Sequence, residues 1–195
     1  MKKLKQPTSL KCFACGKQNP FGLKLEWFNN YDEKQVEASF ELDDNYCSYP
    51  GTVHGGILAT ILDETSGRAI LLDNDFERLM VTLKMEVVYK HNTPTHTPLK
   101  AIGRVVRDGG SRAQVEGKIC LPDGTVTASC KSILFKIPEA VKAKWGPEAD
   151  EWKRTTPTVS DDACEENCTC EENCACGEHD ACEKSCEENC AQAKK

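Results

Sequence analysis

No apolar run in the 195-residue sequence is long enough to span a membrane. The longest apolar stretch with helical character is interrupted by Asp63, Glu64 and Arg68. The first residues are basic and no apolar core follows them, so we expect no secretory signal. From these two absences we expect a cytoplasmic protein that has no membrane partner.

A basic stripe with interleaved aromatic residues is also absent, so we expect no nucleic-acid partner. Charge is instead divided unevenly along the chain. Residues 161–195 carry eleven acids and three lysines, a net charge of −8, whereas the whole chain carries −6. Residues 1–160 are therefore mildly basic at +2, which suits an anionic substrate.

Periodicity predicts an α+β fold in which an antiparallel sheet wraps around one long helix. Alternating apolar and polar residues predict a hairpin with strands at 23–28 and 35–42, joined by a turn at 29–34. A loop at 43–51 then precedes a helix from about Gly55 to about Leu72. Four further strands are expected near 79–90, 98–107, 111–121 and 125–136, with turns at Gly109-Gly110 and at Pro122 to Gly124.

Composition divides the chain into four parts. Residues 1–22 form an N-terminal segment with one Cys-x2-Cys pair, and residues 23–137 hold the long helix and the strands. Residues 138–160 combine a short helix with a proline-containing linker. Residues 161–195 are an acidic tail that contains Cys-Glu-Glu-Asn-Cys three times. Such a tail cannot bury a core, so we expect it to be disordered without metal.

The predicted helix carries two adjacent carboxylates in otherwise apolar surroundings, and one of them is a candidate for chemistry. Asp63 shares a helix face with small residues, which would let a ligand or a partner chain come close. Glu64 stands four residues before Arg68, which favours a surface ion pair between them. We therefore assign the chemistry to Asp63 and a structural pairing to Glu64. The alternative is that Asp63 only caps a buried backbone group.

The start of the same helix offers a second chemical feature. Unpaired N–H groups point outward from the first turn of a helix, and the glycines Gly55 and Gly56 let another backbone approach them. This turn is a ready site for an oxyanion, while the carboxylate further along the helix can activate water. Together the two features supply what acyl-transfer chemistry requires.

This arrangement resembles the hotdog-fold acyl-CoA thioesterases, in particular the branch of the phenylacetate-pathway thioesterases. The resemblance is carried by VHGGILATILD at residues 53–63, where the acid stands nine positions after the histidine. The strand VTLKMEVVY at 81–89 and the segment CFACGKQNPFGL at 12–23 also match, and the similarity extends over residues 12–137. The family implies a hotdog fold and hydrolysis of an acyl-CoA substrate to a free acid and CoA, with no metal needed for catalysis.

The resemblance also implies self-association. Two sheets paired edge to edge would form a homodimer, and the assembly is either this homodimer or a homotetramer that is a dimer of dimers. In hotdog thioesterases the acid and the oxyanion hole usually come from opposite subunits. If that holds here, a monomer would be inactive.

The family further implies roles for individual residues. Asp63 acts either as a general base on water or as a nucleophile that forms a mixed anhydride. Gly55 or Gly56 donates its N–H to the thioester oxygen. His54 either positions the acyl group or water, or holds the turn by hydrogen bonds. Thr82 stands where relatives carry a hydroxyl that orients water, although β-propensity alone also explains a threonine there.

Four more residues are candidates for contacts with the substrate. Ser48 lies six residues before the histidine, where some relatives carry an asparagine, and its shorter side chain can still donate a hydrogen bond. Arg107, Ser111 and Arg112 flank the Gly109-Gly110 turn, which lies near the CoA-binding surface in many relatives. Arginine pairs well with phosphate, although exposed arginines are usually only solvated.

Thiolate ligands that suit Zn(II) or Cu(I) are concentrated in the tail, whose composition resembles a metallothionein. Eight thiolates are enough for two tetrahedral sites, with His179 as a further ligand. The alternative is an acidic, solvated, redox-sensitive tail. A second candidate function follows, a metal-binding or metal-responsive protein whose hotdog domain only dimerises or binds acyl-CoA. The candidate ligands are Cys164, Cys168, Cys170, Cys174, Cys176, Cys182, Cys186 and Cys190.

Cys12 and Cys15 form one Cys-x2-Cys pair near the N-terminus. A zinc site needs more ligands than this pair offers, and a dimer would have to supply a second pair. A turn packed against the mouth of the barrel is the simpler interpretation.

Overall fold

The computed structural model describes residues 3–75 and 78–146. Before the long helix the chain forms β1 (Lys3–Lys5), β2 (Phe28–Asn30), β3 (Gln35–Phe40), the 3-10 helix η1 (Asp44–Tyr46), β4 (Cys47–Tyr49) and β5 (Thr52–Val53). The helix α1 (Gly55–Ala69) and the 3-10 turn η2 (Ile70–Asp73) lead into β6 (Met80–Tyr89), β7 (Leu99–Asp108), β8 (Arg112–Cys120), β9 (Val126–Lys136) and α2 (Glu139–Lys142).

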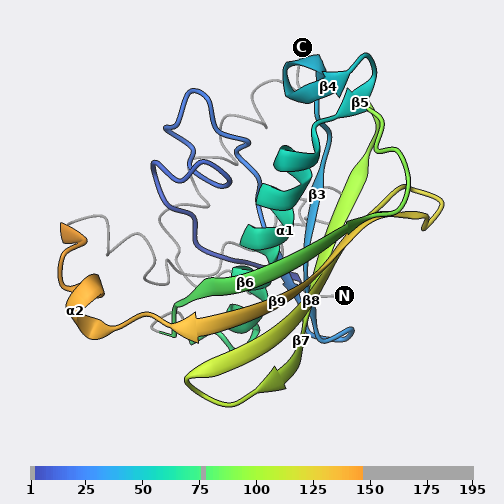
Figure 1. Ribbon diagram of the computed structural model, residues 1–195. Coiled ribbons are helices and arrows are strands. Elements are labelled where there is room, and N and C mark those ends of the chain that lie inside the picture. The colour runs from blue at the N-terminus through green and yellow to red at the C-terminus, as the bar shows by residue number, and fades with distance from the viewer. Residues whose placement is uncertain (1–2, 76–77, 147–195) are drawn as a thin grey trace, which may run out of the picture. The chain divides into compact units, whose positions relative to one another are not determined.

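Among the described residues, seven strands form one antiparallel sheet in the order β1-β2-β3-β7-β8-β9-β6, and α1 packs against it (Figure 1). The strands β4 and β5 make a small separate hairpin near the start of α1. β1 and β6 are the two edges of the large sheet. The predicted α+β class, an antiparallel sheet around a central helix, is confirmed.

One side of α1 is apolar, and this side holds the helix on the sheet. Leu58, Ile61 and Leu62 are at most 3% exposed. Burial of side chains of this size contributes about 1.5–3 kcal/mol each. Gly103 in β7 allows the close approach, because a Cβ there would lie 2.8 Å from the carbonyl oxygen of Thr65.

The four strands after the helix begin and end within one residue of their predicted bounds. Two of the three connections help to explain this agreement, because the β7–β8 and β8–β9 turns each contain a glycine with a backbone conformation that other residues rarely adopt. Gly110 has a φ of 80° in the β7–β8 turn, and Gly124 has a φ of 86° in the β8–β9 turn. These two turns therefore fix where β7 ends, where β8 begins and ends, and where β9 begins, as the sequence indicated.

The N-terminal hairpin differs from the prediction. The strand expected at 23–28 is instead the short β2, since only Phe28–Asn30 pairs with β3. The backbone N–H groups of Leu23 and Leu25 donate to carbonyls of the N-terminal segment. Between them Lys24 has a φ of 54°, which interrupts the extended backbone. The N-terminal segment thus competes with β3 for the backbone hydrogen bonds of residues 23–25. Sequence periodicity does not reveal this competition, which explains the shorter strand.

The predicted loop at 43–51 is also more ordered than expected, because it contains η1 and β4. Gly51 has a φ of 70° and turns the chain from β4 into β5. The backbone N–H of His54 donates to the carbonyl of Tyr46 at 2.8 Å. This segment is thereby held against the start of α1.

The short helix predicted after residue 138 is present as α2, and the rest of the predicted linker lies outside the described residues. The chain divides into two units, residues 1–160 and 161–195. All candidate metal ligands of the tail belong to the second unit and also lie outside the described residues, so their role stays a prediction. Within the described ranges no helix has the length and apolar character needed to cross a membrane.

Candidate active site

A cleft of about 790 Å³ lies between α1 and the edge strand β6. Asp63 and Gly67 line it from the helix, and Thr82 lines it from the strand. Two residues that the sequence nominated for chemistry, on different elements, therefore share one cavity. The cleft lies at the edge of the sheet, because β6 has no outer neighbour among the described strands.

Asp63 lies on a face of α1 that residues 3–75 and 78–146 leave largely uncovered. Its side chain is exposed, and Gly56, Ala59, Thr60 and Gly67 on the same face are exposed or half-buried. A Cβ added at Gly67 would meet no heavy atom within 4 Å. The small residues thus leave room beside the carboxylate for a substrate or a second chain.

Glu64, the neighbouring acid, is engaged in an ion pair with Arg68, although both residues also line the cleft. Its Oε1 accepts a hydrogen bond from Arg68 Nε at 2.9 Å, which confirms the predicted ion pair. The pair is not on the surface, however, because Arg68 is only 2% exposed. The guanidinium lies 5.2 Å from the ring centre of Trp27 and donates to the carbonyl of Pro7. The N-terminal segment covers this face, which the helix sequence alone could not show.

His54 is the N-cap of α1, and its Nδ1 accepts a hydrogen bond from Gly56 N–H at 2.9 Å. The histidine therefore holds the turn, and it engages one of the two predicted oxyanion donors. The N–H of Gly55 makes no hydrogen bond to another described residue. Tyr89 packs against Gly55, where a Cβ would lie 3.3 Å from the ring, and its hydroxyl donates to the Gly55 carbonyl at 2.9 Å.

The helix start and Asp63 do not meet within one chain. Gly55 precedes Asp63 by eight residues. At the rise of an α-helix this separates them by about 12 Å along the axis. A thioester carbonyl cannot contact both, because a hydrogen bond spans only about 3 Å. If Gly55 supplies the oxyanion donor, it must serve the Asp63 of a second chain.

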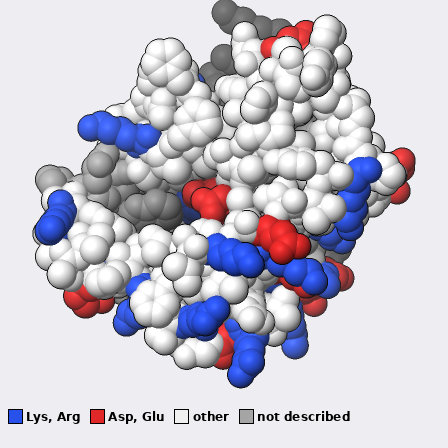
Figure 2. All heavy atoms as spheres, viewed as in Figure 1, with Lys and Arg blue, Asp and Glu red and all other residues white. Residues whose placement is uncertain are grey.

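The candidate substrate contacts also lie outside the cleft that holds Asp63. Ser48 is exposed on β4, in the hairpin beside the helix start. Arg107, Ser111 and Arg112 are exposed around the β7–β8 turn. Figure 2 shows Lys and Arg side chains gathered in the lower part of the view, below acidic groups in a mostly uncharged centre.

β6 presents apolar side chains along its free edge. Val81 is 49% exposed, Leu83 is 66% exposed and Tyr89 is 53% exposed. An exposed apolar edge strand is a template for pairing with another strand. The same edge borders the cleft, so a second chain placed there would also enclose the candidate site.

Sequence reasoning missed most of the apolar wall of the cleft. Met80 and Met85 line it from β6, and Trp145 lines it from the segment after α2. Met80 and Thr82 face the cleft, and in a regular strand the next side chain on that side would be Lys84. The pairing of β6 with β9 shifts register between Thr82 and Lys84, so Met85 takes the inward position instead. Nothing in the sequence pattern indicates the bulge or the position of Trp145.

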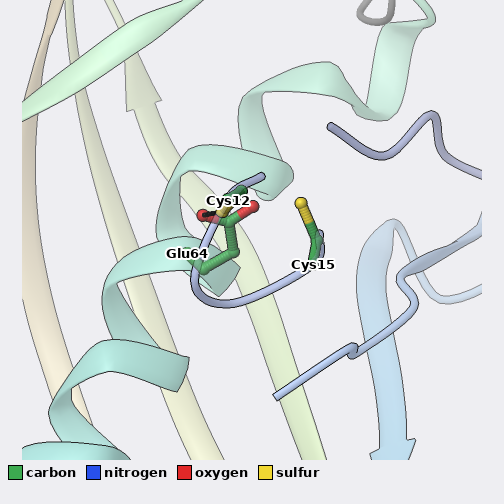
Figure 3. Close-up of side chains that lie close together, drawn as sticks. All are labelled: Cys12, Cys15 and Glu64. Atoms are coloured by element: carbon green, nitrogen blue, oxygen red, sulfur yellow. Dashed lines mark hydrogen bonds between the residues drawn. The ribbon is translucent and has the colours of Figure 1, made fainter. Parts of the chain in front are cut away.

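The Cys-x2-Cys turn packs against α1 rather than against a barrel mouth. Cys12 Sγ lies 3.9 Å from Glu64 Oε2 (Figure 3). A hydrogen bond from the Cys15 thiol lowers the pKa of Cys12 to about 6, against opposing effects of burial and of the Glu64 charge. The same hydrogen bond, together with burial, raises the pKa of Cys15.

Comparison with known proteins finds similarity to thioesterases. Residues 50–128 match the Thioesterase superfamily model. Acyl-coenzyme A thioesterase THEM4 of Mus musculus is 25% identical over 147 residues, which cover 75% of this chain and 59% of that protein. A thioesterase superfamily protein of known crystal structure is 26% identical with a TM-score of 0.58, over 65% of this chain and 60% of that one.

The domain has the hotdog fold of the thioesterase superfamily. A further X-ray structure of a protein from this superfamily is 25% identical with a TM-score of 0.53, over 62% of this chain and 91% of that one. The expected hotdog fold is therefore confirmed. The chain spans about three-fifths of the length of the curated relative named above. Membership of the phenylacetate-pathway branch stays a prediction.

Proposed function

We propose that the protein is an acyl-CoA thioesterase, which hydrolyses a thioester to a free acid and CoA. The observation that carries this proposal is the cleft shared by Asp63 and Thr82 in a domain with the thioesterase superfamily fold. The similarity to an acyl-coenzyme A thioesterase supports the substrate class. The apolar wall with its methionines suits the acyl group, since methionine adapts to irregular apolar ligands.

Asp63 supplies the reactive carboxylate, and Thr82 orients water beside it. As a general base, Asp63 takes a proton from water while the water oxygen attacks the thioester carbonyl. The new C–O bond forms, the C–S bond breaks and the proton passes to the sulfur of CoA. As a nucleophile, Asp63 attacks the carbonyl itself, CoA leaves as thiolate and water then hydrolyses the mixed anhydride. Both routes consume one water and give the same products.

The oxyanion donor in this proposal comes from a second subunit. The Gly55 N–H has no partner among the described residues and stands at a helix start, where the helix dipole favours negative charge. The distance along α1 prevents it from serving its own Asp63. Pairing of two β6 edges would make a homodimer in which one chain's helix start faces the other chain's acid. Ser48, close to the helix start, would then also reach the substrate.

The basic turn between β7 and β8 is the proposed contact for the CoA phosphates. Arg107 and Arg112 are exposed, and no ion pair engages either of them within the described residues. A guanidinium can bind a phosphate with two hydrogen bonds. Ser111, between them in the turn, adds a hydroxyl donor.

Thioester hydrolysis is the direct test. Wild-type and Asp63→Asn proteins are assayed with short, medium, long and aromatic acyl-CoAs by the loss of thioester absorbance. The proposal expects turnover of at least one class, and loss of that turnover in the variant. A folded wild-type protein that hydrolyses none of the four classes would contradict it. Aromatic substrates additionally test the phenylacetate-pathway branch.

Subunit complementation tests the shared site. Gly55→Pro removes the N–H at the first helical position, where proline is tolerated, and His54 already has the extended backbone that proline requires before it. Gly55→Pro and Asp63→Asn should each be inactive alone. Refolded together at equal amounts, they should recover roughly a quarter of wild-type activity, because half of the dimers hold one complete site. No recovery in mixed dimers would overturn the shared site and the assignment of Gly55 as its oxyanion donor.

The cysteine-rich tail is proposed to bind metal without taking part in hydrolysis. Its eight cysteines suit soft cations such as Zn(II) or Cu(I). Deletion of residues 161–195 should remove most bound metal and leave hydrolysis intact. Loss of hydrolysis on deletion would favour the second candidate function, in which the tail carries the activity of the protein.

A further inference from the structure

Three metal-ligating groups from distant parts of the chain meet on the covered side of α1. The thiols of Cys12 and Cys15 come from the N-terminal turn, and the carboxylate of Glu64 comes from the helix (Figure 3). Their ligand atoms all lie within 4.8 Å of one another. Cys15 is buried, and the other two residues are half-buried. The cluster is therefore shielded from solvent without being closed.

The spacing is within about 1 Å of that required by one cation bound by all three groups. Zn²⁺ binds thiolate sulfur at about 2.3 Å and carboxylate oxygen at about 2.0–2.2 Å, so ligand atoms in a tetrahedral site lie about 3.5–3.8 Å apart. Cys12 Sγ and Glu64 Oε2 are 3.9 Å apart, close to that spacing. The half-buried position of Cys12 leaves room for water as the fourth ligand.

The turn that carries the cysteines is preorganised by its own backbone. Gly16 N–H donates to the Cys12 carbonyl at 2.8 Å, and Leu23 and Leu25 donate to the carbonyls of the two residues between the cysteines. A Cβ at Gly16 would lie 2.4 Å from the Cys12 carbonyl oxygen, so the turn requires glycine there. The turn would then lose little conformational entropy when it binds a metal ion.

The charges around the cluster also match a divalent cation. Two thiolates and one carboxylate carry three negative charges, which is unfavourable in a half-buried site. A divalent cation and the buried Arg68 guanidinium carry three positive charges, so the loaded site is neutral. Arg68 Nε donates to Glu64 Oε1, which fixes the carboxylate and leaves Oε2 on the side of Cys12.

We propose that Cys12, Cys15 and Glu64 form a Zn²⁺ site with three protein ligands, independent of the tail cysteines. The bound ion ties the N-terminal segment to α1 one residue away from Asp63. Its role is to hold this covering in place, and it takes no part in the hydrolysis. On binding, Zn²⁺ forms bonds to two thiolate sulfurs and one carboxylate oxygen, and the thiol protons pass to solvent.

Cobalt titration of the reduced protein is the test. The experiment uses the full-length chain with its eight tail cysteines replaced by serine, so that only the body cysteines can respond. We expect one equivalent of Co²⁺ to bind, with a sulfur-to-cobalt charge-transfer band and the visible bands of tetrahedral cobalt. Zn²⁺ should displace it and raise the melting temperature. Absence of stoichiometric binding in this folded, reduced chain would overturn the proposal.

Single substitutions in the same background identify the ligands. Cys12→Ser and Cys15→Ser should each lower the charge-transfer band by about half, since each removes one of two sulfur ligands. Glu64→Gln should keep the band and weaken Co²⁺ affinity by at least about 100-fold. Cys47→Ser, a half-buried body cysteine outside the cluster, should bind as the parent does. A band unchanged by both ligand-cysteine variants, or an affinity unchanged by Glu64→Gln, would contradict the assignment.

Discussion

The two sides of α1 carry neighbouring acids with opposite surroundings. On the cleft side, Asp63 is exposed among small residues and makes no ion pair within the described residues, since Arg68, which also lines the cleft, is paired with Glu64. On the covered side, Glu64 is paired with Arg68, which lies under the N-terminal segment and against Trp27. The open side leaves a group available for chemistry, whereas the covered side uses the same kind of group for stability.

One helix can therefore use one carboxylate for catalysis and the neighbouring carboxylate for stability. A carboxylate that is fully paired is a weak base toward substrate, because its charge is already compensated. A carboxylate left open contributes little to folding. Substitutions on the open side should therefore change activity and spare stability, and substitutions on the covered side should do the reverse.

The largest effect is expected on the open side. Asp63→Asn should lower kcat by about 10²–10⁴-fold, because the amide can neither accept a proton nor attack the thioester. Urea unfolding should show little change in stability, since the side chain is exposed. Asp32→Asn, at an exposed acid in the β2–β3 turn, is the matched control and should leave kcat unchanged. Equal losses in the two variants would contradict the assignment of the acid.

The second effect is on the covered side. Arg68→Ala should lower the free energy of unfolding by about 3–5 kcal/mol, because it leaves Glu64 unpaired and removes the contact with Trp27. Lys131→Ala breaks an ion pair with Glu116 in which both side chains are more than half exposed, so its cost should be below about 1 kcal/mol. Urea denaturation of both variants checks the difference. Similar costs would show that burial does not distinguish the two pairs.

Acid should weaken the sheet around Glu37 in β3, away from both sides of α1 compared above. Burial raises the pKa of Glu37, but hydrogen bonds from Lys3, Gln35, Lys100 and Asn30 outweigh it and lower this pKa to about 2. The unfolded chain binds the proton first, so this stabilisation is complete above about pH 4.5 and is lost as the pH falls toward 2. The loss should not exceed about 3 kcal/mol.

Urea unfolding between pH 2 and pH 6 measures this loss. Glu37→Gln provides the control, because it cannot titrate and should show a flatter dependence over the same range. A variant with the wild-type pH dependence would show that other carboxylates are responsible.

The smallest effect returns to the open side. Thr82→Val should lower kcat by about 10-fold, the equivalent of roughly one hydrogen bond to water. Thr82→Ser keeps the hydroxyl and should restore most of the activity, with KM little changed in either variant. If Thr82 served only strand propensity, Thr82→Val would keep a higher kcat than Thr82→Ser, because valine favours strands more than serine does.

Local rules explain why much of the fold could be predicted. The strands β6 to β9 follow alternating sequence patterns, and Gly110 and Gly124 turn the chain from β7 to β8 and from β8 to β9 in conformations that few other residues adopt. The strand at 23–28 failed because its backbone pairs with the N-terminal turn, a contact made between segments that no periodicity connects. The cleft was half predicted: Asp63 and Thr82 were nominated, whereas a bulge decided that Met85 joins them.

The sequence by itself determined the α+β order, the helix with its acid and glycines, and the pairing of Glu64 with Arg68, because each depends on residues a few positions apart. Only the tertiary structure decided that this pair is buried and that Cys12 and Cys15 meet Glu64. These outcomes depend on which distant segment covers which face of α1. Such coverage follows from packing in three dimensions and leaves no regular spacing in the sequence.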